Sequence, residues 1–169
     1  MGCDQADGLG NQFNTVEMMR ERATACARYP RSTAFHEAGH AVVAWSFGLT
    51  VDAVWVNADD ASGGANISPV DHLTLAEQVA VWWSGTAAES VFECPSHEYA
   101  AFDDHAGVME LLEAHGISEE EHGPALRAEG YNIATARLEA NRTQVIKLAE
   151  RLAVDGRVDA SEFLQLMNG

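Results

Sequence analysis

The sequence predicts a mainly α-helical domain with a small β-hairpin or sheet beside the helix expected over residues 34–47. Over most of the chain, apolar residues recur at the three- and four-residue spacing that is typical of amphipathic helices. Only residues 51–68 follow the two-residue period of strands, around a polar turn that contains glycine. With 169 residues, 47% of them hydrophobic, the chain is long enough to bury one core. We therefore expect residues 15–169 to form a single compact domain after a flexible, polar tail over residues 1–14.

Two helices are expected before the hairpin. Residues 15–29 mix apolar and charged side chains in helical order, and a proline follows them as a stop. Ser32 or Thr33 is placed to cap a second helix over residues 34–47, and Gly48 follows that helix as a C-terminal stop. Because its apolar side chains form a continuous stripe, we interpret this second helix as a core helix.

A hairpin and a long apolar helix come next. The hairpin is expected over residues 51–68, with the turn at residues 57–64. Residues 73–92 then have an apolar helical period that indicates burial on more than one side. Adjacent aromatic residues in such a helix usually pack inside a protein, so we interpret Trp82 and Trp83 as core residues.

The second half of the chain is expected to be helical almost throughout. A helix over residues 102–115 is followed by an acidic loop, and one helical register then runs over residues 124–154. A turn is expected at residues 155–156. Asp159 with Glu162 resembles a capping box, which predicts a short helix at the end of the chain.

Composition and charge exclude several classes of partner. The formal net charge of −16, from 26 acidic and 10 basic residues, repels phosphate backbones and anionic lipid surfaces. No stretch approaches the roughly 20 apolar residues that are needed to cross a bilayer. The three cysteines are far apart in the sequence and form no C-x-x-C pair. We therefore expect no nucleic-acid partner, no membrane association and a reducing, cytoplasmic location.

The chemistry is concentrated in His36, Glu37 and His40, which form an H-E-x-x-H motif inside the helix expected over residues 34–47. Residues four apart share one helical face, about 5–6 Å apart, so both imidazoles can bind one Zn²⁺ ion. Glu37 would then be the general base, taking a proton from a zinc-activated water that attacks a peptide carbonyl. A catalytic zinc also needs a third protein ligand, for which the candidates lie downstream.

Three segments, in the same order, resemble the zinc peptidase domain of the FtsH family. Residues 33–43, Thr-Ala-Phe-His-Glu-Ala-Gly-His-Ala-Val-Val, look like the zinc helix of that family. Residues 85–89, Gly-Thr-Ala-Ala-Glu, are similar to its Gly-x-Ala-Ala-Glu segment. Residues 102–104, Phe-Asp-Asp, resemble the start of the helix that supplies its aspartate ligand. The resemblance runs from about residue 32 to residue 166 and implies a zinc metalloendopeptidase.

The resemblance also implies a ligand set. It makes Asp104 the third zinc ligand, because Val108 and Leu111 then occupy the small or apolar positions of the family pattern. Asp103 is the rival ligand, and a helix N-cap is the structural alternative for either aspartate. Glu89 is implied to be a carboxylate that supports the site, and it could also reach the metal.

The end of the hairpin resembles the edge strand along which substrates of the family lie. This resemblance implies that Gly64, Ala65, Asn66 and Ile67 bind an extended peptide by β-augmentation, with loose specificity.

One departure from the family limits what the activity would be. The sequence contains no G-x-x-x-x-G-K-[ST] loop, and its only lysine is Lys147. We therefore expect ATP-independent hydrolysis of peptide bonds in unfolded or flexible protein segments, with a separate unfoldase or adaptor as a possible partner. The oligomeric state stays open. Two alternatives are a non-catalytic or regulatory metal-binding module of the same fold and a site-specific protease that acts on one regulatory protein.

Overall fold

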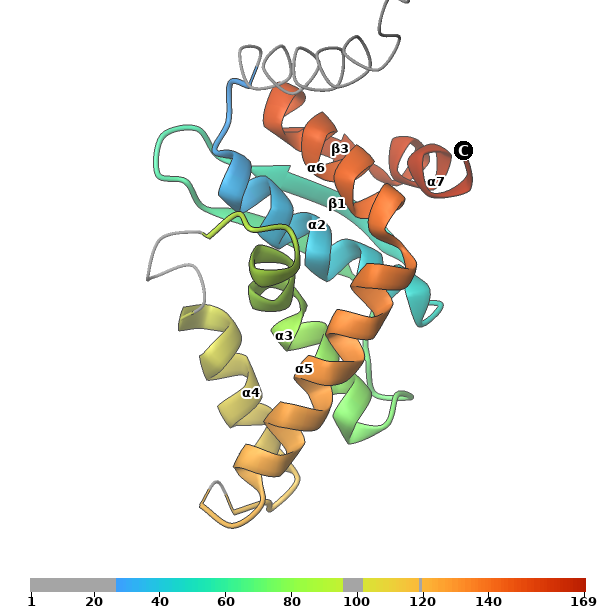
Figure 1. The fold of residues 1–169 in the computed structure, drawn as a ribbon. Coiled ribbons are helices and arrows are strands. Elements are labelled where there is room, and N and C mark those ends of the chain that lie inside the picture. The colour runs from blue at the N-terminus through green and yellow to red at the C-terminus, as the bar shows by residue number, and fades with distance from the viewer. Residues whose placement is uncertain (1–26, 96–101, 119) are drawn as a thin grey trace, which may run out of the picture.

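The computed structural model describes residues 27–95, 102–118 and 120–169 (Figure 1). The expected tail over residues 1–14 and most of the expected helix over residues 15–29 lie outside these ranges. The last residues of that helix are described, and they are not helical. Instead, the backbone amides of Arg28 and Tyr29 both donate to the carbonyl of Ala153, which ties this segment to the C-terminal half of the chain.

The prediction of a mainly helical fold with one small sheet is confirmed. The described residues form six helices and a three-stranded antiparallel sheet. The elements, in chain order, are α2 (Arg31–Ser46), β1 (Val51–Val56), β2 (Gly63–Ile67), α3 (Leu75–Val91), α4 (Phe102–Ala114), α5 (Gly123–Ala140), α6 (Arg142–Asp155), β3 (Arg157–Asp159) and α7 (Ala160–Asn168). Among the described residues, no helix combines the length and the apolar character that a membrane crossing requires.

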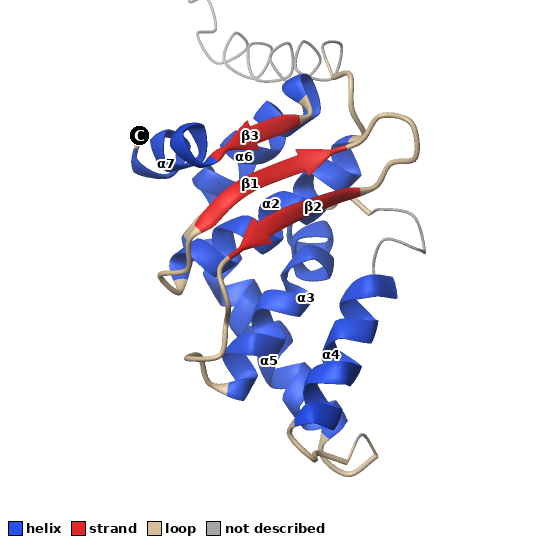
Figure 2. Cartoon of the chain, turned by 180° about the vertical axis from the view of Figure 1, so that it is seen from behind, coloured by secondary structure: helices blue, strands red, loops and turns tan. Residues whose placement is uncertain are grey.

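Helix α2 is the centre of the fold. Every residue from Thr33 to Ala44 is buried, because the sheet covers one side of the helix and α3, α5 and α6 cover the others (Figures 1 and 2). The helix ends before Gly48, whose φ of +83° is the left-handed conformation that suits glycine, as expected. The expected cap at Ser32 or Thr33 is wrong. The helix begins directly after Pro30, and the Thr33 hydroxyl donates instead to the carbonyl of Ala61, at 2.9 Å.

Gly39 lies where α2 and α3 touch. A Cβ atom at this position would lie 2.5 Å from the carbonyl oxygen of Ser84 and 2.7 Å from Cβ of Ala88. A glycine in the middle of a helix costs about 1 kcal/mol relative to alanine, so this close approach gives the residue its structural reason. The contact fixes the distance between the two helices beside the H-E-x-x-H motif.

The sheet contains the expected hairpin and one strand that the sequence did not indicate. Its order is β2-β1-β3, and Figure 2 shows the three strands side by side. Strand β3 pairs antiparallel with β1, with Val158 opposite Val54, directly after the expected turn, where Gly156 has a φ of +74°. A strand of three residues is too short to show a two-residue period in the sequence. Among the described residues, β2 pairs only with β1, so its outer edge is free.

The helical register over residues 124–154 is divided between two helices. Helix α5 ends at Ala140, and α6 begins at Arg142, so Asn141 alone separates the two helices. The amide side chain of Asn141 donates to the carbonyl of Arg137, which satisfies one carbonyl group at the end of α5. The break is not visible in the apolar pattern because Leu138 and Val145 both point into the core, on either side of it.

The caps of the remaining helices were partly expected. Thr74 and Glu77 form a reciprocal capping box at the start of α3, which the sequence reading did not single out. At α7, the carboxylate of Asp159 accepts the backbone amide of Glu162, as expected. The carboxylate of Glu162 bonds the guanidinium of Arg151. The bond from the Glu162 amide to Asp159 is therefore the one that the predicted box contains. The side chain of Glu162, however, connects α7 to α6.

Candidate metal centre

Two histidines of α2 and one aspartate of α4 meet in the interior of the molecule. Nε2 of His36 lies 3.1 Å from Nε2 of His40, and these atoms lie 3.2 and 3.3 Å from the two carboxylate oxygens of Asp104. All three residues are buried, and one ligand atom from each falls within 4.8 Å of the others. His36, His40 and Asp104 therefore form a group that could hold a metal ion.

The other ring nitrogen of each histidine is already bound to an acceptor. Nδ1 of His36 lies 2.6 Å from the Glu89 carboxylate, and Nδ1 of His40 lies 2.9 Å from the carbonyl of Val81. Both acceptors favour the tautomer that carries its hydrogen on Nδ1, which leaves the lone pair on Nε2. The two Nε2 lone pairs would then face each other and the Asp104 carboxylate, an arrangement that needs a proton or a metal ion between them.

The pKa shifts of these three residues also indicate that the site needs positive charge. Burial lowers the pKa of His36, but its contacts with Asp104 and Glu89 outweigh burial and raise the pKa to about 10. The pKa of His40 is also raised, because the charge of Asp104 outweighs burial. Burial raises the pKa of Asp104, but the two histidines hold it well below its usual range. In the absence of a metal, protons supply the positive charge, and a bound metal would displace them.

Asp104 Oδ2 is the atom that fits a metal best. It is buried and forms no hydrogen bond with the described residues, although Nε2 of His36 lies 3.2 Å from it as an ion-pair partner. A buried carboxylate oxygen without a donor is costly, and coordination of a metal removes that cost. Two imidazole nitrogens and one carboxylate oxygen are also donors that Zn²⁺ accepts. The residues present therefore fit a bound divalent metal.

Gly85 of α3 leaves the space in which the two imidazoles meet. A Cβ atom at this position would lie 2.4 Å from Nε2 of His36 and 2.5 Å from Nε2 of His40. Real Cβ atoms do not approach other heavy atoms so closely, so a side chain at residue 85 would push the rings apart. This is a physical reason for glycine at the start of the Gly-Thr-Ala-Ala-Glu segment.

The structure separates the carboxylates that the sequence left as alternatives. Asp104 faces the histidines from inside the first turn of α4, so it is not the N-cap of that helix. Asp103 is exposed and lies at the cavity beside the histidines, with no ion pair to them among the described residues. Glu89 contacts His36 on the side of the ring that faces away from Asp104. The geometry therefore brings Asp104 into the group that could hold a metal and places Glu89 on the far side of His36.

A cavity of about 760 Å³ opens beside the metal group. Its lining includes Glu37 and the residues Gly64, Ala65, Asn66 and Ile67 of β2. Glu37 is 7% exposed, and burial raises its pKa against the opposing effect of the two histidines. The carboxylate of Glu37 therefore lies in the same space as the exposed face of the metal group.

Gly63 allows the start of β2 to approach Glu37. A Cβ atom at Gly63 would lie 2.6 Å from Cγ and 2.7 Å from Oε1 of Glu37. The hydrogen bond from Thr33 to Ala61 holds the preceding loop, in which Ala61 has a strained positive φ of 56°. This loop fixes the start of the free edge strand over the general-base candidate.

The sequence reading missed several residues of the cavity. Trp82 was expected in the core, but it is 37% exposed and lines the cavity, whereas Trp83 is half-buried and packs beside the cluster around Val108. The sequence signal that distinguishes Trp82 from Trp83 is Gly107 of α4. The absence of a side chain there lets the Trp82 ring lie against that helix. The role of the Val81 carbonyl had no signal, because every residue carries a backbone carbonyl.

The fold and the site together define a mainly helical protein with a buried group of two histidines and one aspartate that could hold a metal. Comparison of the chain with models of protein families and with curated proteins finds no match.

Proposed function

We propose that the chain is a zinc metalloendopeptidase that acts without ATP. The observation that carries the proposal is the position of Glu37. This buried carboxylate follows the metal-binding candidate His36 in sequence and lines the same cavity as the metal group. A metal site that only stabilises a fold has no need for a carboxylate beside its open face, whereas peptide hydrolysis needs a base there.

The donor set supports zinc as the metal. Catalytic zinc sites keep three protein ligands and one open position, and His36, His40 and Asp104 supply three ligands on one side of the cavity. When bound, zinc would polarise the substrate carbonyl and lower the pKa of a water to about 7. Glu37 would hold that water and accept its proton, a role that suits a carboxylate whose pKa burial has raised.

The free edge of β2 supports an extended substrate. The strand pairs with β1 on one side, and residues 63–67 line the cavity that contains Glu37. A peptide that adds to this edge would bring its backbone carbonyls past the metal group. Gly64, Ala65, Asn66 and Ile67 would supply backbone bonds, so that side chains of the substrate contribute little to recognition by this strand.

The resemblance to the FtsH peptidase domain supports the same activity, and the absence of a P-loop from these residues supports independence from ATP. The substrates proposed here are unfolded or flexible segments of proteins, because nothing in the described fold would unfold a stable domain. A separate unfoldase or adaptor would extend this range.

The proposal is tested by cleavage of casein by the wild-type chain and by Glu37→Gln, with zinc content measured for both. We expect wild-type activity, zinc in both proteins and a loss of about 100-fold or more in kcat for Glu37→Gln. Zinc without cleavage by the wild type would favour a regulatory metal-binding module or a protease with one specific substrate. Equal activity of the two proteins would contradict the role of Glu37.

A further inference from the structure

We propose that the cavity selects extended peptide segments that carry a lysine or arginine near the bond to be cut, with Asp103 and Trp82 as the residues that recognise the cation. This inference names the substrate class of the proposed peptidase site, and it therefore rests on the proposed function. The observations that carry it are the charges, the aromatic ring and the absence of lysine and arginine from the cavity lining.

Carboxylates face the cavity from two sides. Asp103 approaches from α4, and Asp60 approaches from the loop that precedes β2. Asp60 is held by the backbone amide and hydroxyl of Ser62, and these hydrogen bonds lower its pKa. Neither aspartate belongs to the metal group. A peptide that lies along β2 would therefore pass between two carboxylates that have no role in binding the metal.

Trp82 provides a second, independent reason to expect a cation. Its indole ring lies against Gly107, where a Cβ atom would be 2.7 Å from the ring, and the residue is 37% exposed at the cavity. Asp103 lies four residues before Gly107 on α4, which places it on the same face of that helix, one turn away. An exposed indole beside a carboxylate matches the cation of a lysine or arginine, because the ring face is electron-rich.

Within the described part of the chain, the two histidines of the metal group are the only basic side chains that line the cavity. The residues that line the cavity include neither lysine nor arginine. The formal net charge of −16 would also favour a cationic segment over an anionic one during approach. Away from the metal group, the cavity thus offers acceptors for positive charge and no cation to pair with a negative one.

The test compares the binding of three fluorescent peptides that differ at two positions only. Both positions are lysine in the first peptide, glutamine in the second and glutamate in the third. Anisotropy is measured on zinc-loaded Glu37→Gln, so that the peptides stay intact and the result does not depend on turnover. Each contact to an exposed cation is worth about two- to fivefold in affinity, so we expect the lysine peptide to bind about fivefold or more tightly than the glutamine peptide. The glutamate peptide should also bind more weakly than the lysine peptide.

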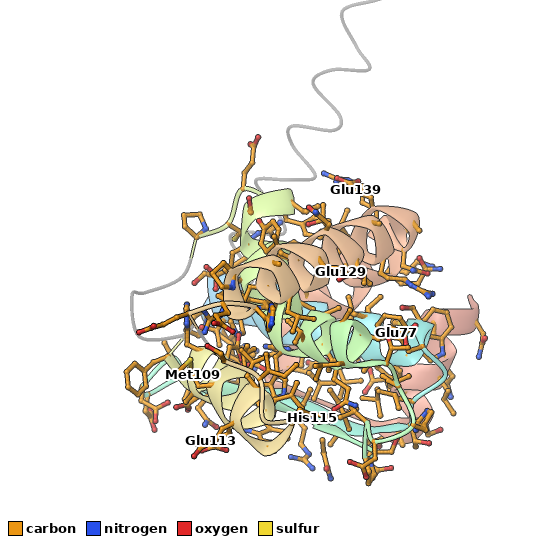
Figure 3. The ribbon with its side chains drawn as sticks, turned by 90° about the horizontal axis from the view of Figure 1, so that it is seen from below. Glu77, Met109, Glu113, His115, Glu129 and Glu139 are labelled. Atoms are coloured by element: carbon orange, nitrogen blue, oxygen red, sulfur yellow. The ribbon has the colours of Figure 1, made fainter. Side chains whose placement is uncertain are left out.

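Variants in the same background locate the preference. Asp103→Asn and Trp82→Leu should each reduce the ratio of lysine to glutamine affinity by about two- to fivefold. The matched control is Glu113→Gln, which removes one exposed carboxylate of α4 (Figure 3) that does not line the cavity. This control should leave the ratio unchanged. At 0.15 M salt, the electrostatic effect of an exposed charge falls off over about 8 Å.

Three results would overturn the inference. They are equal binding of the three peptides, no binding of any peptide, and an equal loss of preference in Asp103→Asn and Glu113→Gln. The last result would assign the preference to diffuse charge. Failure of the proposed peptidase function is recognised separately, as a lack of cleavage of all three peptides by the zinc-loaded wild-type chain.

Discussion

Helices α2 and α4 supply the metal group from different surroundings. His36 and His40 lie on a helix that the sheet and three other helices enclose, within the largest apolar cluster of the fold. Asp104 lies on α4, which packs against α3 through a separate, smaller cluster of Val79, Val108 and Leu112. The main core therefore preforms the histidine half of the site, whereas the carboxylate half depends on the packing of one peripheral helix. A bound metal would couple the two.

Gly85→Ala should have the largest effect on metal binding, because it acts on the histidine half of the site, which the main core holds in place. A methyl group 2.4 Å from Nε2 of His36 has no free space, so the two imidazoles could not keep the positions in which they face one metal ion. We expect loss of bound zinc, measured by elemental analysis. The helix itself should tolerate alanine, which is a better helix former than glycine by about 1 kcal/mol. Zinc retained at the wild-type level in a folded Gly85→Ala protein would show that the histidine half is not rigid.

Two leucines of equal burial sharpen the comparison. Leu112 lies in the α4 cluster and Leu148 in the main core, and both are at most 1% exposed. Either change to alanine costs about 2–5 kcal/mol of packing free energy. We expect both variants to lower Tm, but only Leu112→Ala to weaken the zinc affinity of the folded protein. Titration with zinc and thermal unfolding of both variants measure this, and identical profiles would remove the distinction between the helices.

Glu89→Gln should have a smaller effect than either of these changes. The carboxylate of Glu89 fixes the ring of His36 through a 2.6 Å contact to Nδ1, and an amide can still accept that hydrogen bond. Loss of such an outer partner costs about 10- to 100-fold in metal affinity, and the retained acceptor places Glu89→Gln at the lower end. Competition with a chelator measures the change. An effect as large as that of Asp104→Ala would make Glu89 a ligand.

The sequence predicted the histidine half of the site more completely than the rest. The spacing of His36 and His40 determines their shared helical face, so local geometry was sufficient. The choice between Asp103 and Asp104 was not local, because it depends on how α4 packs, through Gly107, against Trp82 of α3. Features with no side-chain pattern were not predictable, which applies to the carbonyl of Val81 and to the three-residue strand β3. The break at Asn141 was hidden because the apolar period continues across it.

The most direct test of the metal centre is the zinc content per chain of the wild type, Asp104→Ala and Asp103→Ala, purified in the same way. The two substitutions remove neighbouring carboxylates from the same turn of α4, so general effects on charge and on the helix are matched. The account predicts about one zinc per chain in the wild type and in Asp103→Ala, as expected for a site with three protein ligands, and a large loss in Asp104→Ala. No zinc in the wild type, or a loss in Asp103→Ala that equals the loss in Asp104→Ala, would contradict it.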